Sequence, residues 1–145
     1  MNWDHPQPFI ETRQVLDAHI DGLQHTNNAV YVGWCGEVAW AHSEALGLGL
    51  NEYQALDRAM AVTEAKYQYL QATRAGEELA VGTWIERWDS KLTMERRFQI
   101  INCQTGAAVL RASMMFVCIE ISSGRPKRLP PAFLKGYGPA VLAAP

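Results

Sequence analysis

Apolar side chains recur at helical spacing in one long segment of the chain. Between residue 28 and about residue 46 they are separated by three or four positions. The positions are Val30, Trp34, Val38, Ala41 and Ala45. This spacing places them on one face of an α-helix. The glycines of the segment GLGLN, residues 47–51, follow where such a helix should end. The pattern therefore predicts an α-helix from Asn28 to about Leu46.

The predicted helix is apolar on much of its circumference. The wider apolar stripe also comprises Ala29, Val32, Cys35, Ala39 and Trp40. A simple amphipathic helix has a narrower apolar face, because its opposite side meets water. We therefore expect this helix to be covered on several sides and to lie deep in the fold.

Strand-like patterns stand on both sides of this helix. Residues 8–17 form a short β-tolerant run that predicts a first strand. After Tyr53, four segments combine alternating or continuous apolar positions with branched and aromatic side chains. They span residues 59–70, 77–88, 91–102 and 107–121. The connectors between them are short and rich in turn-forming residues. We therefore expect consecutive strands to pair antiparallel as hairpins or near neighbours.

Together these elements predict an α+β domain in which an antiparallel sheet curls around a central helix. The elements follow one another without a linker, and the sequence has no internal repeat. We therefore interpret residues 1–145 as a single domain with a core at about 8–130. The tail, residues 131–145, is rich in proline and small residues. This composition predicts a packed or frayed end with a short helix.

Composition and charge narrow the class of protein. The chain has 145 residues, of which 48% are apolar and 19% charged, as expected for one compact domain with a substantial core. A net charge of -2 gives no general attraction to nucleic acid or to acidic membranes. No apolar run approaches the ~18 residues of a membrane span, and no basic and apolar leader opens the chain. We therefore expect a cytoplasmic protein.

Cysteine and glycine patterns exclude several kinds of chemistry. Cys35, Cys103 and Cys118 are odd in number and widely spaced, so they predict neither a disulfide framework nor a zinc site. We expect them to be reduced and mostly buried. No phosphate-binding glycine loop and no dinucleotide-binding fingerprint is present, so nothing supports nucleotide hydrolysis or a redox cofactor.

The start of the predicted helix carries many polar side chains. The segment HIDGLQHTNNAVYVGW, residues 19–34, holds two histidines, an aspartate and two asparagines before the apolar run. One oxygen-bearing side chain is enough to cap a helix. The surplus of polar groups indicates a candidate functional site at this end of the helix.

The same segment resembles the hotdog-fold acyl-CoA thioesterases of the 4-hydroxybenzoyl-CoA thioesterase family, and is most similar to the long-chain acyl-CoA thioesterase group. The family pattern is met by His19, Asp21, His25, Asn27, Asn28, Ala29, Tyr31, Glu37 and Trp40. The resemblance extends from about Phe9 to Pro130 and includes the closing segment FVCIEISSGRPKRLP. Thr26 replaces the usual valine, which we interpret as an isosteric change of little mechanistic weight. Val30 replaces an arginine that is common in the long-chain group.

The resemblance implies a hotdog fold, in which a curved antiparallel sheet of about five strands wraps a long central helix. It also implies a homodimer whose sheets join edge to edge, with a homotetramer as the alternative, and an active site at the subunit interface. Edge-to-edge pairing removes an exposed strand edge. The implied substrate is an acyl-CoA, and coenzyme A is part of that substrate, so we expect neither a metal nor another cofactor.

Thioester hydrolysis explains why these residue types occur together. The carbonyl must be polarised, its developing negative charge must be stabilised, and either water or a carboxylate must attack. Free N–H groups at a helix start can stabilise the charge, and by resemblance the donor is the backbone N–H of Asn28. Asp21 is the candidate general base or nucleophile, and Gly22 gives the chain freedom to fold back toward the helix.

Other residues of the segment have a structural and a functional interpretation. His25 orients substrate or water, or it is a turn histidine bonded to the backbone. Asn27 suits a helix cap better than a catalyst. Tyr31 and Trp34 belong either to the core or to the lining of an acyl pocket. Glu37 is a second acid or a buried structural partner. His19 has no assigned catalytic role, and the spacing of its neighbouring acids and histidines matches no metal motif.

The phosphates of CoA need cationic partners, and the sequence offers two clusters. Arg125, Lys127 and Arg128 in GRPKR have no nearby acid in the sequence and form the favoured cluster. The basic residues between 87 and 97 alternate with acids. Within that stretch, Ser90 and Lys91 are a second candidate.

The sequence therefore predicts an enzyme that hydrolyses a fatty or aromatic acyl-CoA to the free acid and CoA, in lipid metabolism. Two alternatives stay open. One is an enzyme of the same fold that acts on acyl carrier protein or performs a hydratase step. The other is a non-catalytic acyl-binding protein.

Overall fold

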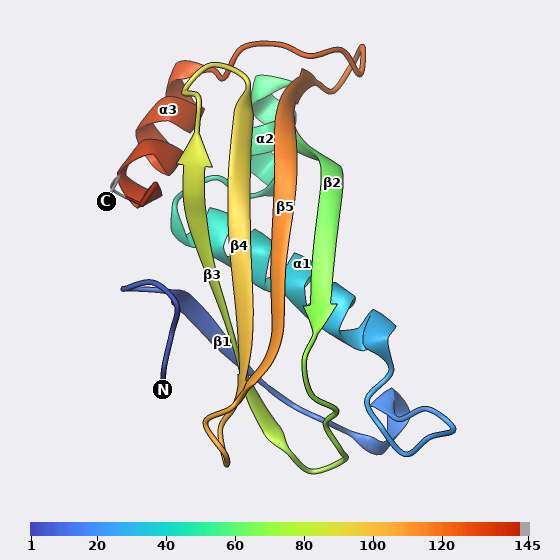
Figure 1. The fold of residues 1–145 in the computed structure, drawn as a ribbon. Coiled ribbons are helices and arrows are strands. Elements are labelled where there is room, and N and C mark those ends of the chain that lie inside the picture. Colours follow the sequence, from blue (N-terminus) through green and yellow to red (C-terminus); the bar gives the residue numbers. More distant parts are fainter. Residues whose placement is uncertain (143–145) are drawn as a thin grey trace. The chain divides into compact units, whose positions relative to one another are not determined.

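Five strands form one antiparallel sheet in the computed structural model, which describes residues 1–142 (Figure 1). The strands are β1 (Phe9–Gln14), β2 (Arg58–Tyr69), β3 (Glu78–Trp88), β4 (Thr93–Asn102) and β5 (Ala108–Glu120). Their order in the sheet is β1-β3-β4-β5-β2. β1 pairs with β3 in a register that runs from Phe9 opposite Thr83 to Gln14 opposite Glu78. All five predicted strands are confirmed, with ends that differ by at most three residues.

The place of β2 corrects the expectation that consecutive strands are neighbours. β3, β4 and β5 follow one another in the sheet as expected, whereas β2 lies at the edge beside β5. The reason is the connector at 70–77, which is too long for a tight hairpin. It is held to β5 at its start, where the Leu70 N–H donates to the Val109 carbonyl at 2.8 Å.

Three α-helices accompany the sheet within residues 1–142. They are α1 (Asn28–Ala45), α2 (Leu50–Leu56) and α3 (Pro131–Tyr137). α1 confirms the predicted long helix, and α3 confirms the short helix expected in the tail. Short 3-10 helices lie at Asp17–His19 and Gly138–Ala140. The last part of the tail, residues 143–145, lies outside the described residues.

The helix α2 was missed because the glycine run has two roles. Gly47 has a φ of 82° and takes the left-handed conformation after α1. Gly49 then stands at the start of α2, where Glu52 Oε1 accepts its N–H at 2.9 Å. A Glu three residues after a cap position is a known signal of a helix start. The segment 47–51 therefore both ends α1 and starts α2, whereas the glycines alone predict only a helix end.

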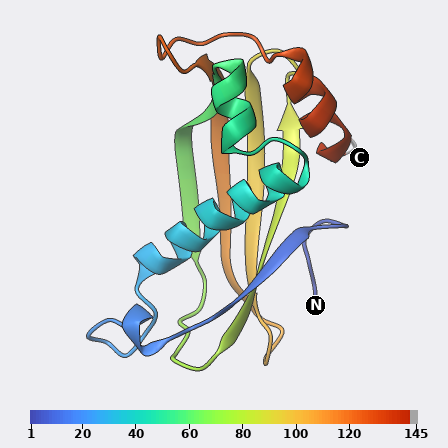
Figure 2. The ribbon, with the colours of Figure 1, turned by 180° about the vertical axis from the view of Figure 1, so that it is seen from behind.

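The burial of α1 also departs from expectation. Tyr31, Trp34, Cys35 and Val38 are buried on one face, but Trp40 is 43% exposed. Within this single chain the helix is therefore covered on one side and not on several. Figure 2 shows the same ribbon from behind, with α1 as the long helix. An exposed apolar residue on a helix is common in soluble proteins. The wide apolar stripe of α1 was therefore not enough to predict that the helix is buried on several sides.

The chain divides into two compact units. The first comprises Met1–Ala39, Tyr67–Thr83 and Phe98–Ala112, and the second comprises Trp40–Lys66, Trp84–Arg97 and Ser113–Pro145. The interpretation as a single domain stays a prediction. Cys35 and Cys118 are buried, Cys103 is half-buried, and all three are free thiols, as expected. No helix of residues 1–142 is long and apolar enough to cross a membrane.

The second unit contains a buried pair of basic side chains. Arg96 is 1% exposed, and its NH1 donates to Nδ1 of His42 at 2.8 Å. Because a guanidinium has no acceptor, His42 accepts at Nδ1 and is neutral with its proton on Nε2. Burial, with the positive charge of Arg96 as the second cause, lowers the pKa of His42 to about 4. Protonation of His42 therefore opposes folding.

We predict that acid destabilises the protein through His42. His42 binds a proton near pH 6.5 in the unfolded chain and only near pH 4 in the folded chain. The stability that comes from keeping His42 neutral is therefore complete above pH 6.5 and is lost as the pH falls toward 4. Urea unfolding of wild type should lose on the order of 2 kcal/mol over this range. His42→Gln, which still accepts a hydrogen bond from Arg96 but does not titrate, should flatten the dependence. His5→Gln serves as the control, and an equal slope in wild type and His42→Gln would contradict the assignment.

Candidate functional site

The loop between residues 20 and 26 closes on itself. Ile20 and Thr26 form an isolated antiparallel bridge, and inside it the Asp21 N–H donates to the His25 carbonyl at 2.8 Å. The left-handed backbone conformation needed for this turn falls on Gln24, with a φ of 64°. Gly22 does not take this conformation, so the prediction that Gly22 lets the chain fold back is wrong. The result is a tight loop that holds Asp21 at its base.

One oxygen of the Asp21 carboxylate holds this loop together. Oδ1 accepts the N–H of Leu23 at 2.8 Å and the N–H of His25 at 3.3 Å. Among residues 1–142, no hydrogen bond reaches Oδ2. An aspartate that bonds the backbone two residues ahead is typical of a turn. Here the turn uses half of the carboxylate and leaves the other half open for chemistry.

The start of α1 is capped by Asn27, as expected. Its Oδ1 accepts the N–H of Ala29 at 2.9 Å, and its carbonyl accepts the N–H of Val30 at 2.9 Å. Its own N–H donates to the carbonyl of His19 at 2.9 Å. In the part of the chain that the structure describes, nothing accepts a hydrogen bond from the Asn28 N–H. The cap therefore leaves this one amide open at the positive end of the helix dipole.

A pocket of about 380 Å³ lies against this helix start and the Asp21 loop. Its volume falls within the range of small-molecule sites. Five of the residues predicted for the site line it: Asp21, His25, Asn27, Asn28 and Tyr31. The structure adds Leu23, Thr26, Tyr69, Leu70, Gln71 and Ala72. The first unit thus brings the residue with the candidate carboxylate and the residue with the candidate amide to one cavity.

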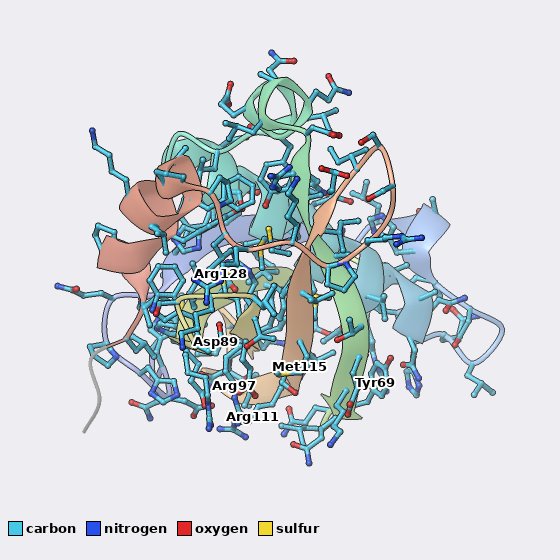
Figure 3. The ribbon with its side chains drawn as sticks, turned by 90° about the horizontal axis from the view of Figure 1, so that it is seen from above. Tyr69, Asp89, Arg97, Arg111, Met115 and Arg128 are labelled. Carbon is cyan, nitrogen blue, oxygen red and sulfur yellow. The ribbon has the colours of Figure 1, made fainter. Side chains whose placement is uncertain are left out.

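The end of β2 supplies the wall of this pocket that sequence reasoning missed. Tyr69 and Leu70 are 44% and 45% exposed, and Leu23 on the loop is 77% exposed. Figure 3 shows Tyr69 at the end of β2. No local signal marks these residues as part of a site, because only tertiary folding brings residues 69–72 to the start of α1. Together they give the pocket an apolar rim.

Tyr31 and Thr26 both reach a third residue, Thr73. Tyr31 is 2% exposed, and its hydroxyl lies 2.5 Å from Oγ1 of Thr73. Oγ1 of Thr26 lies 2.7 Å from the same oxygen. The hydroxyl of Thr26 is therefore used in a buried contact that valine cannot make. The expectation that this replacement has little mechanistic weight stays a prediction.

Two further residues of the family pattern have structural places. Nδ1 of His19 accepts the N–H of Leu16 at 2.9 Å, and the His19 ring packs edge-on against Trp34. Glu37 is exposed and pairs with Arg13 at 3.3 Å, so it is not a buried partner. Within residues 1–142, no three His, Cys, Asp or Glu side chains are grouped so that they could hold a metal ion.

The two candidate phosphate-binding clusters meet in the second unit. Ser90, with a φ of 58°, and Lys91 form the β3–β4 turn, in which Asp89 Oδ1 accepts three backbone N–H groups. These bonds, that of Thr93 first, lower the pKa of Asp89. The Lys91 carbonyl accepts the N–H of Leu129 at 2.8 Å, which ties this turn to the basic segment. Asp89 of the turn and Arg128 of the basic segment are labelled in Figure 3.

The basic segment itself is not free of acids. Lys127 Nζ pairs with Glu120 Oε2 at 2.7 Å, which corrects the expectation that no acid lies near. The strand pairing of β5 with the segment after it, at Ile119 and Pro126, folds Glu120 back toward Lys127. Arg125 and Arg128 are exposed and form no ion pair with any described residue. In the alternating cluster, Arg87 and Arg97 form ion pairs with Glu86.

Comparison with known proteins defines the family. The family model described as "Thioesterase-like superfamily" matches residues 15–136. The chain belongs to this superfamily. The expectation of a thioester hydrolase is confirmed at this level. The long-chain acyl-CoA thioesterase group stays a prediction.

Solved structures share the fold of this thioesterase-like chain. A 1,4-dihydroxy-2-naphthoyl-CoA thioesterase from Synechocystis is 20% identical with a TM-score of 0.81, over 91% of this chain and 96% of that one. A Staphylococcus aureus protein in complex with CoA is 21% identical with a TM-score of 0.85, over 100% and 92%. A 12:0-ACP thioesterase from Umbellularia californica is 19% identical with a TM-score of 0.84, over 97% and 56%. The predicted hotdog fold is confirmed.

Proposed function

We propose that this protein hydrolyses acyl-CoA thioesters, with a fatty or aromatic acyl group, to the free acid and CoA. The observation that carries the proposal is the pocket at the start of α1. There the residue that offers an open carboxylate oxygen, Asp21, and the residue that offers an open amide, Asn28, line one cavity. Membership of the thioesterase-like superfamily supports the proposal, as does the fold shared with a protein in complex with CoA.

In the proposed reaction the Asn28 N–H donates to the thioester oxygen as negative charge develops there. One such preorganised donor lowers the activation barrier by about 3 kcal/mol. Asp21 acts through Oδ2, either by taking a proton from an attacking water or by attacking the carbonyl carbon to form an anhydride that water then hydrolyses. In both routes the C–S bond breaks, and CoA leaves as the thiolate and takes up a proton. His25 orients the substrate or the water from the pocket wall. Asn27 holds the helix start, and the ring of Tyr31 contacts the substrate.

We predict that Asp21→Asn abolishes hydrolysis without opening the loop. The amide oxygen of asparagine can accept the same two backbone N–H groups, but it is neither a base nor a nucleophile. The turnover number for acyl-CoA should fall by about 10²-fold or more, while the thermal midpoint stays near that of wild type. Release of free thiol, followed across short, medium, long and aromatic acyl-CoAs, is the measurement. Equal rates in wild type and variant would contradict the role of Asp21.

The same panel distinguishes the other functions. Matched acyl carrier protein substrates separate a preference for CoA from a preference for the carrier, and the fold shared with a 12:0-ACP thioesterase makes this comparison necessary. Background release from every thioester, with acyl-CoA binding retained, would replace the enzyme by an acyl-binding protein.

The phosphates of CoA are proposed to bind to the exposed cations of the second unit, namely Arg125 and Arg128, with Ser90 and Lys91 beside them. Lys127 contributes less to this surface, because its charge is shared with Glu120. Guanidinium groups suit phosphate oxygens because they present several donors in a plane.

We predict that the double variant Arg125→Ala and Arg128→Ala raises KM for acyl-CoA by roughly tenfold. KM for an N-acetylcysteamine thioester, which has the same acyl group and no phosphate, should stay unchanged. Lys135→Ala, which removes an exposed lysine of the same unit, is the control. Equal effects on both substrates would show that the two arginines do not serve the phosphates.

A homodimer joined through β2 is proposed for the assembly. β2 is an edge of the sheet, and Val62 is 54% exposed on it. An edge strand with unpaired backbone groups readily pairs with a second copy. The residues that follow β2 line the pocket, so a partner at this edge would stand next to the site.

We predict a solution mass of about twice the 16.2 kDa of the chain, by light scattering at micromolar concentration. A mass of about four times that value would indicate the tetramer. Val62→Lys should shift the equilibrium toward the single chain, because it places a charge on the proposed interface. A mass of one chain for wild type would refute the dimer.

A further inference from the structure

Thr73 is a fully buried threonine in the connector between β2 and β3, and it bonds to both halves of the site. It is 0% exposed. Its carbonyl accepts hydrogen bonds from the N–H of Thr26 at 2.9 Å and from the hydroxyl of Thr26, with Oγ1 at 3.2 Å. Its own Oγ1 lies 2.7 Å from Oγ1 of Thr26 and 2.5 Å from the hydroxyl of Tyr31. All three side chains lie in the first unit.

The number of protons limits the directions of these hydrogen bonds. Each hydroxyl has one proton to donate. Thr26 Oγ1 reaches two acceptors, the Thr73 carbonyl at 3.2 Å and Thr73 Oγ1 at 2.7 Å. When Thr26 donates to the carbonyl, Thr73 donates to Thr26 and Tyr31 donates to Thr73; when Thr26 donates to Thr73 Oγ1, Thr73 donates to Tyr31. In both arrangements Thr73 Oγ1 bonds to Thr26 and to Tyr31, and the chain of three hydroxyls is complete.

This chain joins the two elements that the reaction needs. Thr26 closes the loop that carries Asp21, because it forms the antiparallel bridge with Ile20. Tyr31 stands in the first turn of α1, next to the open amide of Asn28. Thr73 is bonded to both residues, and Thr73 itself does not line the pocket.

We propose that Thr73 is a positioning residue that sets the Asp21 carboxylate against the Asn28 amide, an inference that rests on the proposed function. A misplacement of about 1 Å between reacting groups can reduce a rate by roughly 10²-fold. Because the three hydroxyls are buried, water cannot easily replace a lost partner.

The experiment compares Thr73→Val with Thr73→Ser. Valine has nearly the shape of threonine but removes the hydroxyl that bonds to Tyr31 and Thr26, so that Thr26 keeps only its contact with the carbonyl of residue 73. Serine retains the hydroxyl. We expect Thr73→Val to lower kcat for acyl-CoA by roughly 10- to 100-fold with KM unchanged, and Thr73→Ser to restore most of the loss. Amide hydrogen exchange of peptides that cover residues 20–34 should become faster in Thr73→Val and stay slow in Thr73→Ser.

Ile101→Val is the control for a general loss of stability. Ile101 is fully buried in β4 of the same unit and takes no part in the hydroxyl chain. The Ile101→Val variant should lower the thermal midpoint and leave kcat near the wild-type value. Wild-type kcat in Thr73→Val, or an equal loss in the valine and serine variants, would overturn the proposal. Absence of thioesterase activity in wild type would refute the proposed function instead, and hydrogen exchange at residues 20–34 would then still test the structural part.

Discussion

An α-helix begins with N–H groups that the helix itself cannot satisfy, and the rest of this structure depends on how α1 uses them. Asn27 satisfies the amides of Ala29 and Val30 with its side chain and its carbonyl. The amide of Asn28 is left open toward a pocket. A full cap would have stabilised the helix further, but it would have occupied the amide that serves as donor in the proposed reaction. The site is therefore built from an incomplete cap.

The carboxylate shows the same division between structure and chemistry. One oxygen of Asp21 closes the loop by accepting two backbone N–H groups, and the other oxygen stays available. A carboxylate that also forms its own turn cannot easily rotate away from the pocket. Rigid placement of this kind lowers the entropy that must be lost when the substrate reacts. The buried hydroxyl of Thr73 extends this rigidity from the loop to the helix.

Much of the fold and part of the site could be predicted from local patterns. The helix at Asn28–Ala45 and the strands followed from spacing, and the cap at Asn27 followed from its side chain and position. Features that depend on contacts distant in sequence could not be predicted. The edge position of β2, the pair of Lys127 with Glu120, and the hydrogen bonds of Thr73 each arise only when the chain is folded. The resemblance to thioesterases pointed to Asp21 and Asn28, whose roles stay proposals, while the valine of the family pattern gave no indication of the hydrogen bonds of Thr26.

The central claim is that a thioester carbonyl sits between Asp21 and the amide of Asn28. A crystal structure with a non-hydrolysable acyl-CoA analogue, in which the thioester sulfur is replaced by a methylene group, tests this claim most directly. The account predicts the carbonyl oxygen at roughly 2.7–3.1 Å from the Asn28 nitrogen, with the carbonyl carbon facing Oδ2 of Asp21 directly or through one water. A ligand whose carbonyl lies outside the pocket at the start of α1 would contradict it.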